Sequence, residues 1–198
     1  MYVVNLVNRY MERPTELHLQ SVKRILRYLK GTTELGIFYS NGGDEELVGY
    51  TDSDYAGDVE DRKSTMGYMF MLSSGVICWA SKKQPVVTLS TTEVEFLATA
   101  SCSCQAVWLR RLLEELGYVQ HEAIVIYCDS SSAIKLSRNS IMHGHSKHID
   151  VRFYFLRDLS KDGMVKMVHC RSQEQVADIM NKPLKLDMLD IYSMHKSI

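Results

Sequence analysis

The sequence predicts a single α/β layer built on a mixed sheet, with an antiparallel meander at one end and parallel strands at the other. Three observations predict it: a strand followed by a hairpin, a long amphipathic helix, and then a continuous apolar strand that alternates with helices. The length of 198 residues fits one domain with an appendage better than two domains. The formal charge of −1 excludes a strongly basic, histone-like nucleic-acid binder.

The N-terminal part is expected to be helical over about the first thirty residues. Thr15 can cap this region and Gly31 can end it. A short strand, Leu35–Tyr39, is expected to follow. The apolar residues of the helix are Leu17, Val22, Ile25, Leu26 and Leu29, and the basic residues between them are Lys23, Arg24, Arg27 and Lys30.

The first core strand is expected at Leu47–Asp52, and it runs directly into the acidic segment DSDYAGDVED. Two more strands, Tyr68–Leu72 and Val76–Ala80, are separated by a Ser-Ser-Gly turn and predict a hairpin. Either Thr91 or Thr92 can cap the long helix that follows and ends near Gly117.

The second half of the chain begins with the apolar run Ala123–Cys128, which is typical of a buried central strand. It continues with helices at Ser131–Leu136, His148–Leu159 and Gln173–Asn181, and with a strand at Met164–His169.

Carboxylates stand at the ends of two expected strands and in two flanking helices. Asp52 closes the first core strand, Asp129 follows the apolar strand directly, and Asp178 lies in the last helix. Glu93 or Glu95 lies in the first turns of the long helix. A carboxylate placed directly after six apolar residues is costly unless it meets a cation or hydrogen-bond donors. Functional sites of open α/β sheets also lie at the carboxyl ends of strands.

These acids together favour a metal site over separate structural roles, although Asp129 taken alone is better explained as the cap of the helix that follows it. Ligands that are all oxygens suit Mg²⁺ or Mn²⁺ rather than zinc. Such a set can hold two ions that activate a water and stabilise the leaving oxygen in phosphodiester cleavage. A zinc site at His143, His145 and His148 is disfavoured because no cysteine lies at zinc-site spacing.

Seven segments between residues 47 and 185 form a specific pattern in this order: YTDSDYAGD, DRKSTMGYMFML, VICWASKKQPVVTLSTTEVEFLATA, WLRRLLEELG, YCDSSSAIKLSRN, SKHIDVRFYFLRD and VADIMNKPL. They resemble the ribonuclease H region of copia-type LTR retrotransposon Pol polyproteins. The preceding HLQSVKRILRYLKGTTELGIFY resembles the segment that connects the reverse transcriptase to that region. The resemblance implies a connection segment at 1–46, a ribonuclease H domain at 47–185 and a tail at 186–198.

The resemblance further implies a five-stranded mixed sheet flanked by helices, two Mg²⁺ (or Mn²⁺) ions, and endonucleolytic hydrolysis of the RNA strand of RNA–DNA hybrids. Its catalytic and metal-binding residues map onto Asp52, Glu95, Asp129 and Asp178. Glu95 is preferred to Glu93 because it precedes an aromatic-x-Ala triplet. The loop CRSQEQ lacks the histidine that some cellular ribonucleases H carry there.

Basic residues that flank the acids are candidates for contacts to the phosphates of the hybrid, although both pairs can also be solvated turns. They are Arg62, Lys63, Lys82 and Lys83. The expected partners are the RNA–DNA hybrid and the reverse transcriptase domain of the same polyprotein.

Two alternative interpretations of the chain are less favoured, because all four acids are present and Glu95 follows the hairpin-to-helix segment. A non-catalytic domain that binds hybrid or supports a polymerase would have the same fold, whereas integrase relatives require three acids at other spacings. No apolar run approaches the ~18 residues of a membrane span, and the N-terminus shows no secretion signal. An intracellular protein is therefore expected, in cytoplasmic virus-like particles or in the nucleus, with reduced cysteines.

Overall fold

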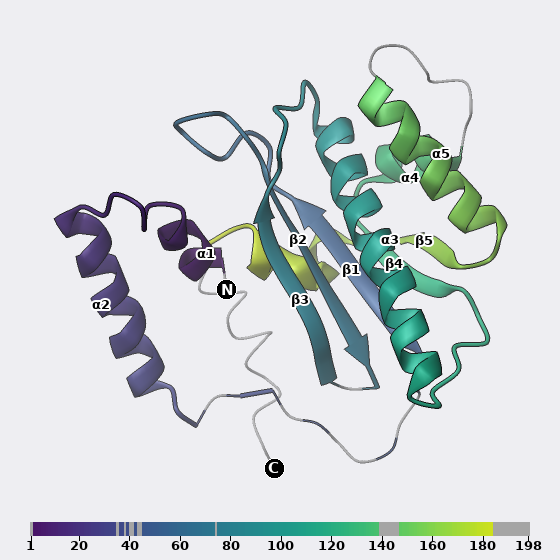
Figure 1. The fold of residues 1–198 in the computed structure, drawn as a ribbon, viewed down its shortest axis with the longest axis horizontal. Coiled ribbons are helices and arrows are strands. Elements are labelled where there is room, and N and C mark those ends of the chain that lie inside the picture. Colours follow the sequence, from purple (N-terminus) through teal and green to yellow (C-terminus); the bar gives the residue numbers. More distant parts are fainter. Residues whose placement is uncertain are drawn as a thin grey trace.

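A five-stranded mixed sheet lies at the centre of the molecule (Figure 1). The computed structural model describes residues 2–34, 36–37, 39, 42, 45–73, 75–138 and 147–183. The strands of the sheet follow the order β3-β2-β1-β4-β5. They are β1 (Leu47–Ser53), β2 (Thr65–Leu72), β3 (Gly75–Lys83), β4 (Ile124–Cys128) and β5 (Val165–His169).

Strand direction divides this sheet into two halves. β1, β2 and β3 form an antiparallel meander, whereas β4 pairs in parallel with both β1 and β5. The alternate residues Ile124, Ile126 and Cys128 of β4 are buried, and the strand lies between two others. A strand in that position requires an apolar sequence on both faces. The arrangement confirms the predicted mixed five-stranded α/β fold.

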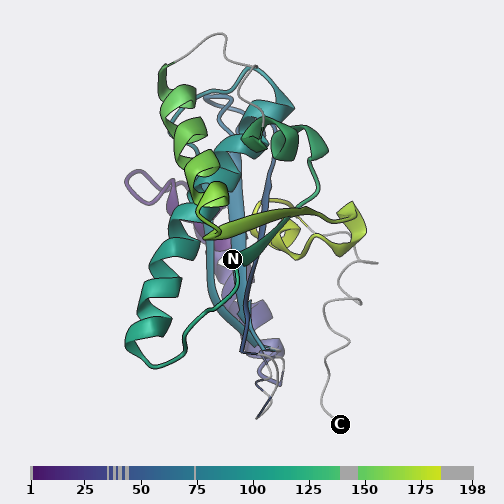
Figure 2. The same cartoon turned by 90° about the vertical axis from the view of Figure 1, so that its right-hand side faces the viewer.

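Three helices cover one face of the sheet, and Figure 2 shows them on one side of it, in teal and green. They are α3 (Thr91–Glu115), α4 (Ser131–Arg138) and α5 (Lys147–Lys161). The main hydrophobic core fills the space between these helices and the sheet. Its largest buried side chains include Phe70, Phe96, Ile126, Phe153 and Leu156.

The N-terminus of α3 differs in detail from the sequence prediction. The cap is Ser90, whose Oγ accepts a hydrogen bond from the backbone N–H of Glu93 at 3.1 Å. Neither Thr91 nor Thr92 is the cap, because the helix already includes both residues. Three adjacent hydroxyl residues are all good N-caps, so the sequence alone does not determine which one ends the extended segment.

The C-terminal segment lies on the opposite face of the sheet, in yellow-green in Figure 2. It forms two 3-10 helices, η1 (Ser172–Glu174) and η2 (Val176–Met180), so the prediction of one helix over Gln173–Asn181 is wrong. The buried Gln175 lies between them, donates its side-chain amide to the carbonyl of Thr51 at 2.9 Å and accepts from the N–H of Ala177. These contacts replace the backbone bonds that a continuous helix would make.

Close packing fixes η2 on the sheet. A Cβ placed on Gly67 of β2 would lie 2.5 Å from the Cβ of Met180. Only glycine therefore permits this approach of η2 to the strand.

The N-terminal appendage consists of two helices, α1 (Tyr2–Asn8) and α2 (Glu16–Gly31), rather than one helical stretch. α1 is bound to the edge strand β3, because the side-chain amide of Asn5 donates to the carbonyl of Ser81 and, at 3.1 Å, to its hydroxyl. α2 has no buried residue and lies beyond α1, away from the sheet (Figure 1). Among the described residues, no helix is long and apolar enough to cross a membrane.

Some predicted segments fall wholly or partly outside the described residues. Of the strand expected at Leu35–Tyr39, only residues 36, 37 and 39 are described, and they have no regular secondary structure. The tail at 186–198 and the loop with His143 and His145 lie outside the described ranges. β1 begins at Leu47, but the division of the chain at residue 46 stays a prediction.

Candidate metal centre

The parallel pairing of β1 with β4 brings the carboxyl ends of these strands to one edge of the sheet. Asp52 is part of β1 and has only 1% of its surface exposed. Its Oδ2 accepts hydrogen bonds from the Asn181 side-chain amide and from the Lys182 ammonium, both at 2.8 Å. Asp129 follows the last residue of β4 and accepts a hydrogen bond from the Ser172 hydroxyl at 2.9 Å.

The long helix α3 supplies the glutamate of the site. The Glu95 carboxyl is buried, and its Oε1 accepts from the backbone N–H of Ser53 at 3.4 Å, whereas its Oε2 is buried without any hydrogen-bond partner. Glu93 turns to the preceding loop and accepts from the N–H of Leu89 at 2.9 Å. Glu95 is therefore the glutamate that faces Asp52 and Asp129.

A thiol also belongs to this cluster. Ligand atoms of Glu95, Cys128 and Asp129 lie within 4.8 Å of one another. Burial raises the pKa of the Cys128 thiol to about 12, so it is uncharged near neutral pH and a poor ligand for hard cations. Cys128 was not among the predicted site residues, and in the sequence only its position beside Asp129 indicates it.

Asp178 joins the group from η2. Its Oδ1 accepts from the Lys182 ammonium at 2.9 Å, so one ammonium bridges Asp178 and Asp52. The contacts thus connect Asp178 to Asp52, and Asp52 and Asp129 both repel the Glu95 carboxylate. The four predicted acids, which come from β1, α3, the end of β4 and η2, gather at one edge of the sheet.

Burial and mutual repulsion raise the pKa values of the two innermost acids. Burial is the main reason why the pKa of Glu95 rises to about 9, and repulsion by Asp52 and then Asp129 adds to it. Burial also raises the pKa of Asp52 to about 6, an effect that Asp178 increases and that Lys182 opposes. Carboxylates crowded in this way are typical of sites that bind a cation or exchange a proton.

These residues fit a divalent metal ion. Oε2 of Glu95 is buried and has no hydrogen-bond partner. A bound cation would compensate this oxygen in place of a hydrogen-bond donor. The negatively charged ligand atoms of the cluster are all carboxylate oxygens, which Mg²⁺ and Mn²⁺ prefer.

The chain is similar to retrovirus-related Pol polyproteins of plant transposons, although no family model matches the sequence. The chain is 46% identical, over 91% of its length, to the retrovirus-related Pol polyprotein from transposon TNT 1-94 of Nicotiana tabacum. It is 43% identical, over 92% of its length, to that from transposon RE1 of Arabidopsis thaliana. The chain belongs to the copia-type Pol polyproteins, in their ribonuclease H region. It spans only 14% and 12% of the length of these two relatives.

Solved structures show the same fold for this ribonuclease H region. The N-terminal ribonuclease H domain of a Mycobacterium tuberculosis protein superposes with a TM-score of 0.52 at 12% identity, over 78% of this chain and 100% of that chain. The protease-reverse transcriptase of prototype foamy virus gives a TM-score of 0.50 at 12% identity, over 74% of this chain and 22% of that one. At this identity the likeness establishes the fold and no residue role.

The basic residues near the acids differ in how they are engaged. The Lys83 ammonium lies 2.6 Å from the buried Asp58 and 2.8 Å from Asp61, and Lys63 lies 3.5 Å from Asp61. Lys82, one residue away, is exposed, and both lysines line a cavity of about 310 Å³ between β3, α3 and α5. Lys82 is therefore more accessible to a phosphate than Lys83, which stabilises the loop before β2.

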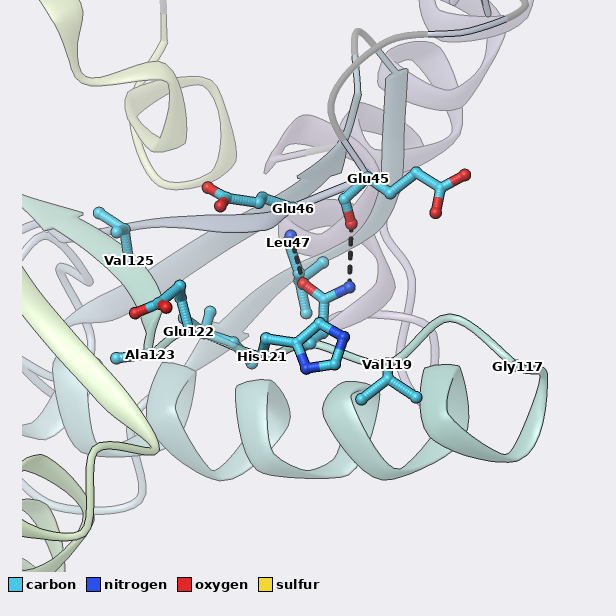
Figure 3. A pocket seen from close by; sticks show the side chains of 11 residues that line it. Glu45, Glu46, Leu47, Gly117, Val119, His121, Glu122, Ala123 and Val125 are labelled. Atoms are coloured by element: carbon cyan, nitrogen blue, oxygen red, sulfur yellow. Dashed lines mark hydrogen bonds between the residues drawn. The ribbon is translucent and has the colours of Figure 1, made fainter.

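A second cavity, of about 410 Å³, lies at the other end of the sheet, where β1 begins (Figure 3). The buried Gln120 braces this end, because its side chain accepts from the N–H of Leu47 and donates to the carbonyl of Glu45. Neither of the two cavities includes any of the four acids.

Proposed function

We propose that this ribonuclease H region cuts the RNA strand of RNA–DNA hybrids by two-metal hydrolysis, within a retrotransposon Pol polyprotein. The observation that carries the proposal is the gathering of Asp52, Glu95, Asp129 and Asp178 at one sheet edge, with a buried Glu95 oxygen that has no donor. Bound divalent ions would supply an activated water and would stabilise the charge on the leaving oxygen.

The chain's own residues hold the acids in place. Asp52 is part of a strand, Glu95 belongs to a 25-residue helix, and η2 packs tightly on β2. Carboxylates on such rigid elements lose little freedom when they bind a cation. Burial raises the pKa of Glu95 to about 9, so the residue holds a proton near neutral pH, and a cation bound beside it would favour the ionised carboxylate.

Selectivity for a hybrid must come from the surface around the acids. We propose that Arg62, Lys63, Lys82 and Lys83 lie near the phosphates of the hybrid. Lys82 is the proposed main contact because it is exposed, whereas Lys63 and Lys83 are engaged by acidic side chains. Recognition would then depend on backbone shape and 2′-hydroxyls rather than on base sequence.

The upstream polymerase is the proposed protein partner. α2 exposes Leu26, Tyr28 and Leu29 by more than half of their surface, and no helix or strand of the described sheet covers them. A reverse transcriptase domain of the same polyprotein would bury this apolar surface. Action inside the cell, in a virus-like particle or in the nucleus, stays a prediction.

The decisive experiment incubates the purified chain with a labelled RNA–DNA hybrid in Mg²⁺, in Mn²⁺ and in EDTA. We expect cleavage of the RNA strand alone, loss of cleavage in EDTA, and a fall of several orders of magnitude in Asp52→Asn. Asp162→Asn, an exposed aspartate in the turn before β5, is the matched control and keeps full activity.

Two results would contradict the proposal. Equal cutting of single-stranded RNA, duplex RNA and hybrid would show a nuclease without hybrid selectivity. Hybrid binding without cleavage in either metal would favour the alternative of a non-catalytic domain that binds hybrid or supports the polymerase.

A further inference from the structure

Lys182 places a positive charge between two of the four acids. Its ammonium lies 2.8 Å from Oδ2 of Asp52 and 2.9 Å from Oδ1 of Asp178. Both distances are those of charge-assisted hydrogen bonds. A single cation thus neutralises two carboxylates that would otherwise repel each other.

The backbone of Lys182 is fixed, whereas its side chain has a route to solvent. Its N–H donates to the carbonyl of Asp178 at 3.0 Å, directly after η2, which packs on Gly67. The Lys182 side chain is 40% exposed, compared with 2% for that of Asp52. Four rotatable carbons can therefore carry the ammonium outward without a change in the backbone.

The second donor to Asp52 differs from Lys182 in this respect. Asn181 is 1% exposed, and its amide donates to the same Oδ2 of Asp52 at 2.8 Å. Asn181 cannot leave without repacking, so it holds Asp52 whether or not a second cation is present. Lys182 is the removable member of the pair.

We propose that the Lys182 ammonium is a built-in counter-ion that holds Asp52 and Asp178 together when metal is absent and competes with divalent cations for their oxygens. This inference rests on the proposed metal centre. Lys182 is accordingly a positioning residue that lowers the affinity for metal and raises the stability of the metal-free protein. A neutral side chain at this position tightens metal binding and destabilises the metal-free fold.

The test measures metal binding directly, by isothermal titration calorimetry of the EDTA-stripped chain with MnCl₂ and MgCl₂. Lys182→Met is expected to bind the metal about tenfold more tightly or better, because a unit charge close to both ligands is removed. Its melting temperature in EDTA is expected to fall below that of the wild type. Lys161→Met, an exposed lysine at the end of α5, removes the same charge far from the acids and should change neither quantity.

Two further measurements test the proposal even if the Lys182→Met variant folds poorly. Lys182→Arg keeps the cation, so it should retain the metal-free melting temperature and bind metal no more tightly than the wild type. In the wild type, the NMR signal of the Lys182 side-chain methylene next to the ammonium should move along the Mg²⁺ binding curve and stay unchanged with Na⁺ at equal ionic strength.

The outcomes separate the two proposals. If the wild type binds metal and Lys182→Met binds it equally or more weakly, or the lysine signal does not move, the counter-ion role is overturned and the metal centre stands. If neither protein binds metal, the metal centre itself fails. If both proteins bind metal and Lys182→Met binds it more tightly than the wild type, the result supports the counter-ion role and the metal centre.

Discussion

Replacing Glu95 by glutamine is expected to stabilise the metal-free protein, although the same change should abolish its activity. The pKa of Glu95 rises from 4.5 to about 9 in the folded chain, mainly through burial and then through repulsion by Asp52 and Asp129. Between these values the folded state keeps a proton that the unfolded state has lost. The free energy of unfolding therefore falls as pH rises through this window. The loss is absent only below the pKa of Glu95 in the unfolded chain.

The size of the effect follows from the shift. At pH 7, which is about 2.5 units above the unfolded pKa, Glu95 is ionised in the unfolded chain and still protonated in the folded chain. This difference lowers the free energy of unfolding by about 3 kcal/mol. Glutamine is a neutral isostere that avoids this penalty. For a protein of 198 residues, such a gain corresponds to a rise of roughly 6–12 °C in melting temperature.

The assay is urea unfolding in EDTA at pH 5, 7 and 9, for the wild type, Glu95→Gln and Glu93→Gln. The wild type should lose stability with rising pH, and Glu95→Gln should lose much less. Glu93→Gln is the matched control, because Glu93 is less buried than Glu95 and its carboxyl accepts from the N–H of Leu89 in the preceding loop. If Glu95→Gln is no more stable than the wild type at pH 7, or keeps the same pH slope, the assigned burial of Glu95 is incorrect.

The remaining predictions concern metal, stability and salt. Saturating Mg²⁺ should raise the melting temperature by ligand linkage, and Asp129→Asn should reduce that rise; a rise of equal size in the variant would remove Asp129 from the site. Lys82→Ala should weaken hybrid binding and lower the slope of log affinity against log salt by about one, whereas an unchanged slope would exclude a phosphate contact. Lys83→Ala should instead destabilise the fold by roughly 1–3 kcal/mol, because it leaves the buried Asp58 short of a partner, and urea unfolding measures this loss.

The parts of the fold that follow from local pattern were predictable. β4 is a run of apolar residues, and the hairpin of β2 and β3 surrounds a polar turn, so both elements appear where the sequence indicates. Asp52 and Asp129 were predictable as neighbours because the sequence places each at the carboxyl end of a strand, although β1 ends one residue later than predicted, at Ser53. The choice of Glu95 over Glu93 came from the resemblance, and the structure shows its physical reason: residues two apart on a helix point in different directions.

Contacts between distant segments were not predictable from pattern. The break between η1 and η2 depends on Gln175 reaching Thr51, which lies 124 residues earlier in the chain. The engagement of Lys83 depends on the buried Asp58, and the position of Lys182 depends on Asp52. Each of these side chains is unremarkable in its local sequence, and only the tertiary packing gives it a partner.

Two groups in the site reduce the repulsion among its four carboxylates. Four clustered carboxylates would carry four negative charges, but Glu95 holds a proton near neutral pH and Lys182 contributes one positive charge. Both compensations are reversible, since the proton can dissociate and the ammonium can move to solvent. Once the proton and the ammonium have left, two divalent cations would balance the charge of all four carboxylates. The groups that reduce the repulsion without metal are therefore the groups that metal binding must displace.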